Sequence, residues 1–528
     1  MILYKNNLRN INLIKNKLNL LKTNSLVSIN NFMNNINFYE KEKPPLPKKS
    51  LNEKFSFFID KSSQMLNNFT LIDPYKNLNK DDQLILLDNK MNNTNKLQNI
   101  IIDTKMPLKT GKKRLVILGT GWAGARLAKD IDCINKYDLT IISSKNHMVF
   151  TPLLASSCVG TVHNQSVIEN IRHLQPALRA PQNHFYLAHA KSIDTYNKTI
   201  DCVSDNNTTF RIGFDKLVIA TGGKPMTFNI PGVNENAYFL KNLNDSIKIR
   251  KKLLENVCLA GIPTIKSEER DKLLHFVIVG GGPTGVEFAS ELSNFINEDM
   301  SSYNPNIKAS AKITLIEGNE LLNSFDKNLS SYAIQKLIDG GVYIKKAQVN
   351  KINKNIIELS DGSTIDYGMC IWSTGIGSSE FIKGLDLKKI NNGKILVDDL
   401  LRVYNTNNRV NDDIYALGDV CANKENPLPP LAQVAEQQGK FLAYYLNNID
   451  SLSEDHKFNY NHLGSMVSLT TGKGILQIGT NNKYKFTGLT SWLAWRSAYL
   501  TKLQSSKNKI NILSQWIGTY IKGREIGF

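Results

Sequence analysis

The chain has 528 residues, of which 41% are hydrophobic, and this is enough apolar material for several folded domains. Its formal net charge of +18 at pH 7 could reflect a nucleic acid partner, an anionic membrane or a basic targeting segment. The basic residues do not gather into one tract with interleaved aromatic side chains, and many lysines lie in asparagine-rich stretches. We therefore expect no nucleic acid among the partners.

Cysteine usage and hydropathy exclude several classes of protein. No two of the six cysteines stand at C-x-x-C or C-x-x-x-x-C spacing, which argues against a disulfide framework, a zinc ribbon and a redox-active dithiol. We expect buried free thiols and no metal site. No apolar run approaches the ~20 residues that a membrane-spanning helix needs, so the chain should not cross a bilayer, although it can lie on one.

The N-terminal region differs in composition from the rest of the chain. Residues 1–40 are basic until the first acid, Glu40, and their aliphatic residues recur on one helical face. This is typical of a mitochondrial transit peptide, and the alternative is a disordered tail. Residues 41–112 carry prolines and repeated Asn, Lys and Asp without periodicity, so we interpret them as a low-complexity linker.

A strand, a glycine turn and a helical pattern follow the linker. The apolar run Arg114–Leu118 precedes GTGWAG, whose glycines are Gly119, Gly121 and Gly124. This G-x-G-x-x-G spacing is the dinucleotide-binding fingerprint, in which glycines permit a tight turn and let a pyrophosphate approach the helix N-terminus. The next strand ends at Ser143 rather than at an acid. This half therefore either binds its ribose through Ser143 or is not a nicotinamide site.

A second fingerprint lies further along the chain. The apolar run Phe276–Val279 is followed by Gly280, Gly282 and Gly285 and then by a helical pattern. Here the next strand does end in an acid, Glu317. A carboxylate at this position accepts hydrogen bonds from a free ribose 2′-hydroxyl and repels a 2′-phosphate, so we expect NADH rather than NADPH. The alternative is that Glu317 is only an exposed glutamate at a strand end.

Each fingerprint is followed by a strand that ends in Thr-Gly, and a strand that ends in Gly-Asp comes last. The three pairs are Thr221 and Gly222, Thr374 and Gly375, and Gly418 and Asp419. The repeat predicts two homologous nucleotide-binding domains. A carboxylate at a turn such as Asp419 can bind the ribityl hydroxyls of a flavin, and as the third of three ordered motifs it is specific.

Together these motifs resemble the two-dinucleotide-binding flavoprotein superfamily. In that pattern GTGWAG would hold FAD without a covalent bond, GGGPTGVE would hold NADH, and ALGD would complete the FAD site. The segments 146–154 (NHMVFTPLL) and 432–439 (AQVAEQQG) narrow the resemblance to the type II NADH:quinone oxidoreductases, which are single-subunit, rotenone-insensitive NADH dehydrogenases. The resemblance covers residues 113–528.

The resemblance implies roles for further residues. Thr151 and Pro152 would lie beside the flavin, and Glu287 near the place where nicotinamide and flavin stack. Gln433 and Gln437 are four residues apart, so they share one helix face, and in the family that face lines the quinone site. The alternative for both glutamines is simple solvation. Glu436 is assigned no role.

Two amphipathic segments end the chain. Apolar residues recur at helical spacing between basic flanks: Trp492, Trp495, Tyr499 and Leu503 in the first segment, and Ile510, Leu513, Ile517 and Ile521 in the second. Such stripes are typical of helices that lie in a membrane interface, and the basic flanks attract anionic lipid. The alternative is a helix pair that forms a dimer or docks on the core, and both can hold.

We therefore predict an α/β protein with two Rossmann-like domains, the NADH domain inserted in the FAD domain, and a C-terminal amphipathic membrane-anchoring segment. The expected boundaries are 1–40 for the transit peptide, 41–112 for the linker, 113–250 and 376–480 for the FAD-binding domain, 251–375 for the NADH-binding domain and 481–528 for the anchoring helices.

The resemblance implies an enzyme that passes two electrons from NADH through FAD to a membrane quinone. Without a transmembrane bundle there is no route for proton pumping. We expect a peripheral, monotopic protein of the mitochondrial inner membrane on the matrix side, a homodimer, and an anionic bilayer surface as a partner. Lys502 and Lys507 are both conceivable proton donors to the quinone.

Two other functions are compatible with parts of the pattern. A sulfide:quinone oxidoreductase has the same scaffold but needs paired cysteines at the flavin, for which Cys158 and Cys370 are the plausible pair. A flavoprotein cell-death factor would bind DNA through its basic surface. The complete NADH fingerprint with Glu317 argues against the first.

Overall fold

The computed structural model describes residues 110–300, 305–425, 427–452, 456–469, 471–479 and 483–526, and it has the expected α/β architecture. The expected transit peptide, residues 1–40, and the linker up to residue 109 lie outside the described residues. No helix in the described part of the chain is long and apolar enough to cross a membrane.

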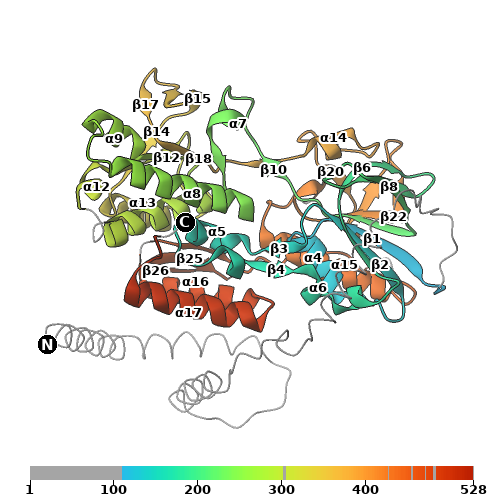
Figure 1. Ribbon diagram of the computed structural model, residues 1–528. Helices are drawn as coiled ribbons and strands as arrows, with labels where there is room; N and C mark the ends of the chain where they lie inside the picture. The colour runs from blue at the N-terminus through green and yellow to red at the C-terminus, as the bar shows by residue number, and fades with distance from the viewer. Residues whose placement is uncertain are drawn as a thin grey trace, which may run out of the picture. The chain divides into compact units, whose positions relative to one another are not determined.

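The first domain contains an eight-stranded sheet (Figure 1). In spatial order its strands are β23 (Cys421–Asn423), β20 (Ile395–Val397), β21 (Arg402–Tyr404), β22 (Val410–Ala416), β9 (Lys216–Ile219), β1 (Lys113–Leu118), β2 (Tyr137–Ser143) and β5 (His184–Leu187). The strands from β22 to β5 run parallel. The apolar runs of the central strands β1, β2 and β9 are buried, as expected of a parallel sheet covered by helices on both faces.

Two helices of this domain touch at a glycine. α4 (Trp122–Asp130) follows the first fingerprint, and α15 (Ala432–Asn447) packs against it. A Cβ on Gly439 of α15 would lie 2.5 Å from the carbonyl oxygen of Ala123 on α4, so a larger residue would push the helices apart. This contact brings the first turns of α15 beside the Gly418–Asp419 turn.

The second domain contains a five-stranded parallel sheet. In spatial order its strands are β11 (Tyr238–Phe239), β18 (Met369–Trp372), β12 (His275–Val279), β13 (Lys312–Glu317) and β14 (Val342–Lys346). The longer helices are α8 (Leu243–Ala260), α10 (Pro283–Asn294) and α13 (Lys327–Asp339). The edge strand β11 precedes the boundary expected at residue 251, which falls inside α8. A two-residue strand carries too little pattern to be recognised in a sequence.

A two-stranded antiparallel sheet joins the domains. β10 (Lys224–Pro225) follows the first Thr-Gly turn, β19 (Ile376–Gly377) follows the second, and the two strands pair. Smaller sheets pair β3 (His147–Val149) with β4 (Ile168–Asn170), β6 (His189–Asp194) with β7 (Thr199–Val203) and β8 (Thr209–Gly213), and β15 (Val349–Ile352) with β16 (Ile356–Leu359) and β17 (Thr364–Asp366). The shorter helices are α5 (Leu154–Cys158), α6 (Ile171–Leu174), α7 (Val233–Asn236), α9 (Ser267–Leu273), α12 (Pro305–Ser310) and α14 (Glu380–Gly384).

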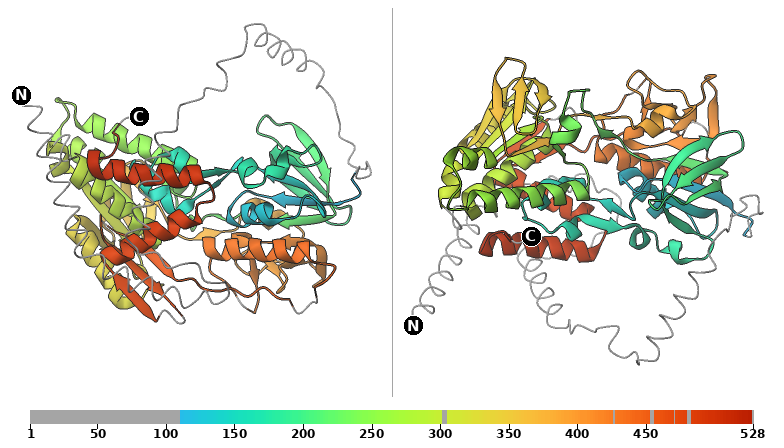
Figure 2. Two further views of the ribbon diagram at one scale, coloured as in Figure 1. Left: turned by 90° about the horizontal axis from the view of Figure 1, so that it is seen from below. Right: turned by 45° about the horizontal axis from the view of Figure 1, so that its top comes forward.

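The C-terminal module contains one sheet and two helices, drawn in the reddest colours of Figure 2. They are β24 (Ser465–Ser468), β25 (Gly474–Ile478), β26 (Tyr484–Thr487), α16 (Leu489–Lys502) and α17 (Ser506–Lys522). Two strands of this sheet precede the boundary expected at residue 481. The helices therefore belong to a folded module and do not form a separate tail.

The two apolar stripes face different surroundings. Trp495 on α16 and Leu503, the C-cap of that helix, are buried in the hydrophobic cluster that also contains the core of the second domain. On α17, Ile510, Leu513 and Ile517 are 60%, 41% and 52% exposed. The stripe on α16 therefore docks on the core, which is the alternative to a membrane-interface helix. The stripe on α17 forms the exposed apolar face.

Candidate active site

The first fingerprint leaves no room for a side chain at its first and last glycines and leaves open space at its middle glycine. Gly119 has a φ of +105°, and a Cβ there would lie 2.5 Å from the carbonyl oxygen of Ala220. A Cβ on Gly124 would overlap the carbonyl oxygen of Gly119. A Cβ on Gly121, in contrast, would meet no described atom within 4 Å, and Gly121 caps α4 without a side-chain hydrogen bond. The N-terminus of α4 is therefore open to a phosphate group.

The second fingerprint repeats this geometry. Gly280 has a φ of +115°, and a Cβ on it would overlap the carbonyl oxygen of Ser373. A Cβ on Gly285 would overlap the carbonyl oxygen of Gly280, while Gly282, the cap of α10, faces open space. Two sites of the same construction thus lie at the starts of α4 and α10, as the duplicated motif predicts.

Ser143 is buried at the end of β2 and is fixed by its neighbours. The hydroxyls of Thr120 and Ser143 are 3.0 Å apart, and the backbone N–H of Lys145 donates to the Ser143 hydroxyl at 3.2 Å. The Thr120 hydroxyl also lies 3.0 Å from the carbonyl oxygen of His147. The fingerprint turn is therefore tied to the loop that follows β2, and Ser143 stays the predicted ribose partner.

Thr151 and Pro152 lie in the 3₁₀ turn η2 (Thr151–Leu153), next to the start of α4. The indole nitrogen of Trp122 donates a hydrogen bond to the Thr151 hydroxyl at 3.1 Å, and the Trp122 ring lies 5.2 Å from the ring of Phe150. Trp122 is the residue after Gly121. The turn predicted to lie beside the flavin is thus held against the first fingerprint.

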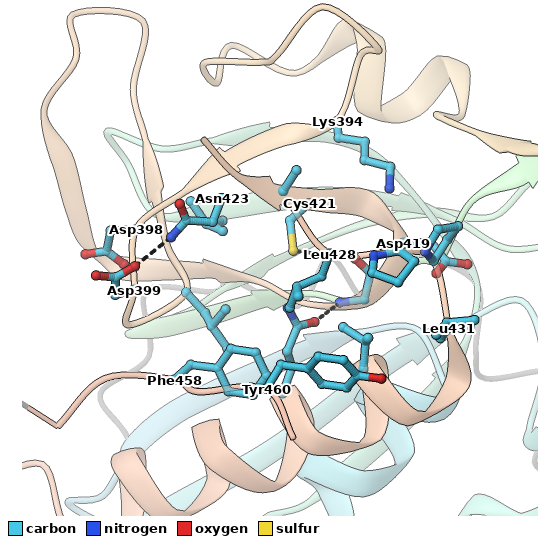
Figure 3. A pocket seen from close by; sticks show the side chains of 18 residues that line it. Lys394, Asp398, Asp399, Asp419, Cys421, Asn423, Leu428, Leu431, Phe458 and Tyr460 are labelled. Carbon is cyan, nitrogen blue, oxygen red and sulfur yellow. Dashed lines mark hydrogen bonds between the residues drawn. The ribbon is translucent and has the colours of Figure 1, made fainter. Parts of the chain in front are cut away.

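The Gly418–Asp419 turn stands beside a pocket (Figure 3). Gly418 has a φ of +74°, and its N–H donates to the Gln438 side chain at 2.7 Å. The pocket wall also includes Cys421 and Tyr460. Gln438 is buried on α15, so this helix fixes the turn directly. Gln438 was not predicted from the sequence, because the family pattern assigned roles to Gln433 and Gln437 and none to Gln438.

Lys241 is the charged partner of Asp419. Its Nζ lies 3.7 Å from Asp419 Oδ2, is buried, and has no hydrogen-bond partner among the described residues. Burial lowers the pKa of Lys241, and the charge of Asp419 opposes this. An ammonium group in this state needs further acceptors. The oxygen-rich FAD fits this site on that ground, together with the open start of α4.

The two Thr-Gly turns lead into the strands that join the domains. Gly222 has a φ of +68° and lies just before β10. The Thr374 hydroxyl donates to the carbonyl oxygen of Met226 at 2.9 Å, so the second turn binds the segment that follows the first. Thr221 and Gly375 are exposed. The structure thus brings both predicted turns to the junction between the domains.

Glu317 lies directly against the second fingerprint. Its Oε2 accepts a hydrogen bond from the N–H of Gly281 at 2.6 Å, and its Oε1 accepts one from the N–H of Asn319 at 2.8 Å. The carboxylate is therefore fixed at the end of β13, beside the turn. Each oxygen keeps a second lone pair for a ribose hydroxyl.

Glu287 lies on α10 but is bound by the C-terminal module. Its Oε1 accepts hydrogen bonds from the indole nitrogen of Trp495 at 2.9 Å and from the N–H of Ser468 at 3.1 Å. Burial raises the pKa of Glu287 to about 8, while these two hydrogen bonds lower it and the charge of Glu291 adds to the rise. A carboxyl group that changes charge near neutral pH is suited to proton transfer.

Gln433 and Gln437 share one face of α15, as their spacing predicts. The Gln433 amide donates to the carbonyl oxygen of Gly464 at 3.0 Å and accepts from the N–H of Leu463 at 3.1 Å. The Gln437 amide donates to the carbonyl oxygen of Asn461 at 2.8 Å and accepts from the same residue's N–H at 3.0 Å. Both side chains therefore clamp the segment that enters the C-terminal module, and neither is simply solvated.

Glu436 and Lys502 form an ion pair that the sequence did not indicate. Lys502 Nζ lies 2.7 Å from Glu436 Oε2, and Arg126 Nη1 lies 3.5 Å from Glu436 Oε1. The pair joins α16 to α15 near α4. Lys507, the other conceivable proton donor, is exposed on α17.

The cysteine pair needed for sulfide chemistry is not brought together. Cys158 and Cys370 are fully buried in two different hydrophobic clusters. Burial raises the pKa of both thiols, which disfavours a reactive thiolate. No group of three or more His, Cys, Asp or Glu side chains in the described part of the chain could hold a metal ion.

The position of Glu317 predicts a change in cofactor preference. Glu317→Gln should lower kcat/KM for NADH by about tenfold, because a charge-assisted hydrogen bond contributes about 1.5–3 kcal/mol, and should favour NADPH relative to NADH. Initial rates with both cofactors measure this. Glu358→Gln, in the same domain and with a carboxylate that accepts a hydrogen bond from Asn353, is the matched control. An unchanged ratio of the two rate constants would contradict the role of Glu317.

Burial of Glu287 predicts a pH-dependent stability. Its pKa is raised on folding, so the folded protein binds more protons than the unfolded chain between pH ~4.5 and ~8, and stability falls as the pH rises through this window. Glu287→Gln removes this loss and should raise the melting temperature more at pH 9 than at pH 5. Calorimetry at both pH values measures it, with exposed Glu268→Gln as the control. An equal change in melting temperature at both pH values would show that folding does not raise the pKa of Glu287.

The comparisons with known proteins agree with this arrangement. Residues 113–439 match the family model of the pyridine nucleotide-disulphide oxidoreductases, and residues 462–525 match that of the NDH2 C-terminal domain. The internal alternative NAD(P)H-ubiquinone oxidoreductase A1, mitochondrial, of Solanum tuberosum is 43% identical over 441 residues, which is 79% of this chain and 88% of that protein. The external NADH-ubiquinone oxidoreductase 2, mitochondrial, of Saccharomyces cerevisiae is 35% identical over 456 residues, 78% and 82% of the two chains.

Solved structures give the same result. NDH2 from Plasmodium falciparum in complex with NADH has a TM-score of 0.73 at 27% identity and covers 79% of this chain and 100% of that chain. The sulfide:quinone oxidoreductase from Aquifex aeolicus, at 17% identity and a TM-score of 0.57 over 78% of this chain and 96% of that one, shares the fold alone. With two fingerprints of one construction, the Gly-Asp turn and the C-terminal module, the chain belongs to the type II NADH:quinone oxidoreductases of the pyridine nucleotide-disulphide oxidoreductase family.

Proposed function

We propose that this enzyme oxidises NADH and reduces a membrane quinone through non-covalently bound FAD, without pumping protons. The observation that carries this function is the pair of open helix starts at Gly121 and Gly282, on domains joined where the two Thr-Gly turns meet. The NAD(P)H-ubiquinone oxidoreductases to which the chain is similar align with 79% and 78% of it, and residues 462–525 match the NDH2 C-terminal domain.

FAD, when bound, supplies a two-electron carrier between the nicotinamide and the quinone. The start of α15 provides a positive environment for negative charge on that carrier. Its N-cap, Leu431, makes no side-chain hydrogen bond, so the first N–H groups of the helix are free to face a ligand beside Asp419. The positive end of the helix dipole then stabilises negative charge there.

Glu287 holds a proton on α10, the helix that follows the nicotinamide fingerprint. Because Oε1 accepts both hydrogen bonds, Oε2 is the atom that carries and releases a proton. The raised pKa keeps the carboxyl neutral up to about pH 8, so it is a proton donor at physiological pH. Trp495 fixes its orientation from α16.

The quinone site is proposed beside the glutamine clamp. Gln433 and Gln437 hold the backbone at Asn461–Gly464 and thereby set the wall between the flavin turn and the C-terminal module. A quinone headgroup bound there would lie beside amide groups already held in place, at little further entropic cost. Glu436, the residue before Gln437 on α15, forms an ion pair with Lys502, one of the two conceivable proton donors to the quinone.

The exposed face of α17 is proposed to lie on an anionic bilayer. Besides Ile510, Leu513 and Ile517, the face includes Tyr520 and Ile521, which are 59% and 57% exposed. Exposed lysines at both ends of α17 attract anionic headgroups, and isoleucines enter the acyl boundary. A quinone with an apolar tail stays in the bilayer, so an enzyme that reduces it must dock there.

The location is proposed to be the matrix face of the mitochondrial inner membrane. The relatives are named mitochondrial, and the identity to the internal potato enzyme, 43%, exceeds that to the external yeast enzyme, 35%. NADH oxidation that requires permeabilised mitochondria supports this face. A homodimer through the same module is part of the proposal.

Half-reactions test the function. Anaerobic NADH should bleach the flavin of the purified enzyme, and added quinone should restore its colour. Glu287→Gln should retain FAD. It should slow flavin reduction by NADH or flavin reoxidation by quinone by about 10²–10⁴-fold, the range for loss of a general acid or base. The pH dependence of that step near pH 8 should be lost. Stopped-flow spectroscopy measures both. A protein that binds no FAD, or whose flavin NADH leaves oxidised, would refute the proposal.

Vesicle binding tests the face of α17. Burying an isoleucine contributes about 1.5–3 kcal/mol, so Ile510→Glu and Ile517→Glu should each weaken sedimentation with anionic vesicles by about tenfold or more. Activity with a short-chain, soluble quinone should stay unchanged. Ile338→Glu, on a side chain of α13 that is 50% exposed, is the matched control. If these variants change the oligomeric state and not vesicle binding, the face is an interface between copies of the chain.

A further inference from the structure

Residues 523–525 are fastened to the second domain. Gly523 has a φ of +81°, and a Cβ there would lie 2.8 Å from Asp299 Oδ1. The same oxygen accepts a 2.8 Å hydrogen bond from the N–H of Arg524, and Arg250 on α8 donates to the carbonyl oxygen of Glu525. Both the backbone conformation and the available space call for glycine. This segment is therefore a built contact.

The Arg524 side chain is only 4% exposed and is surrounded by acceptors. Nε donates to the Thr161 hydroxyl at 2.9 Å, and Nη1 lies 2.6 Å from Asp299 Oδ2. Nη1 also lies 3.3 Å from Glu298 Oε2, and Nη2 lies 3.5 Å from Glu291 Oε2. One guanidinium thus serves three carboxylates. Removing a buried ion-pair partner leaves its carboxylates uncompensated.

Glu291 links this contact to the active site. It lies four residues after Glu287 on α10, so the two carboxyl groups are neighbours one helical turn apart. The hydroxyls of Ser156 and Thr161 donate to Glu291 at 2.8 and 2.7 Å, which fixes its position. A neighbouring negative charge disfavours ionisation of Glu287. The strength of this effect depends on how well Glu291 is paired.

The groups around the two carboxyls come from every side. By element they are Trp495, Arg496 and Tyr499 on α16, Ser468 on β24, Cys158 on α5, Glu298 and Asp299 on η5 (Phe295–Met300), and Arg524. The strands and α13 packed against α10 contribute buried aliphatic side chains. Arg496 is held between the rings of Trp492 and Trp516, at 4.0 and 4.3 Å. Arg524 is the cation with an ion pair to Glu291.

We propose that Arg524 is a positioning residue that, by pairing with Glu291, sets the pH at which Glu287 takes up and releases its proton. Its importance for turnover rests on the function proposed above for Glu287. Loss of Arg524 leaves the charge of Glu291 unpaired beside Glu287, and this uncompensated negative charge favours the protonated form of Glu287.

Infrared difference spectroscopy of the FAD-bound enzyme gives a readout that does not depend on turnover. The carbonyl band of protonated Glu287 is the band that Glu287→Gln removes, and its loss with rising pH gives a titration midpoint. Arg524→Gln should raise this midpoint by about one pH unit. An opposite charge within 4–6 Å shifts a carboxyl pKa by about 1–3 units, and the low end applies because Arg524 acts indirectly, through Glu291. Arg524→Lys should restore most of it.

A double-mutant cycle shows whether the effect passes through Glu291. Glu291→Gln should lower the midpoint of Glu287, and adding Arg524→Gln to Glu291→Gln should change it little further. Arg402→Gln is the matched control, because Arg402 is likewise largely buried, with a side chain that is 18% exposed, and is paired with Asp398 and Asp412, but in the first domain. It should leave the midpoint unchanged.

The outcomes separate this proposal from the function above it. An unchanged midpoint in Arg524→Gln, or an equal rise in the Glu291→Gln background, would overturn the role of Arg524. If Arg524→Gln does not fold, a midpoint that fails to fall in Glu291→Gln alone overturns it. Normal half-reactions in Glu287→Gln would instead refute the function of Glu287, while the midpoint stays measurable. In turnover, the pH limb that Glu287→Gln abolishes should move upward in Arg524→Gln.

Discussion

The contact between the first and last glycine of each fingerprint determines the rest of the structure. A Cβ on Gly124 or Gly285 would overlap the carbonyl oxygen of the glycine five residues before it, so the helix starts directly against the end of its strand. This leaves the middle glycine facing open space and points the free N–H groups of the helix at that space. Both cofactor sites follow from this geometry, because any side chain would push helix and strand apart.

The C-terminal module completes the site rather than only anchoring it. Trp495 and Ser468 supply both hydrogen bonds to Glu287, and the glutamine clamp on α15 holds the segment that leads into the module. α16 therefore serves the active site and α17 presents the exposed apolar face. Since α16 and α17 are consecutive helices of one module, the hydrogen bond from Trp495 to the buried Glu287 carboxyl and the exposed apolar face belong to the same folded unit.

The fold was predictable wherever the spacing of nearby residues determines the local structure. The fingerprint glycines, Glu317 and the Gly-Asp turn follow from rules that act within a few residues. The direction of the stripe on α16 did not follow, because Trp495 has the helical spacing of a lipid-facing residue and only tertiary contact buries it. The roles of Lys241 and Arg524 did not follow either. The sequence places Arg524 only among the basic residues that flank the second apolar stripe, and the partners of the two cations, Asp419 and Glu291, are distant in the chain.

The buried ammonium of Lys241 shows how cofactor binding and folding are coupled. Nζ has given up its hydration, yet its nearest carboxylate oxygen, on Asp419, is 3.7 Å away and makes no hydrogen bond to it. A buried charge without hydrogen bonds is costly, so an oxygen-rich ligand that supplies acceptors to Nζ would stabilise the site. A ligand that binds only the folded state stabilises it in proportion to the logarithm of its concentration. The residues predicted to hold FAD are thus also those that a bound oxygen-rich ligand would stabilise in the folded state.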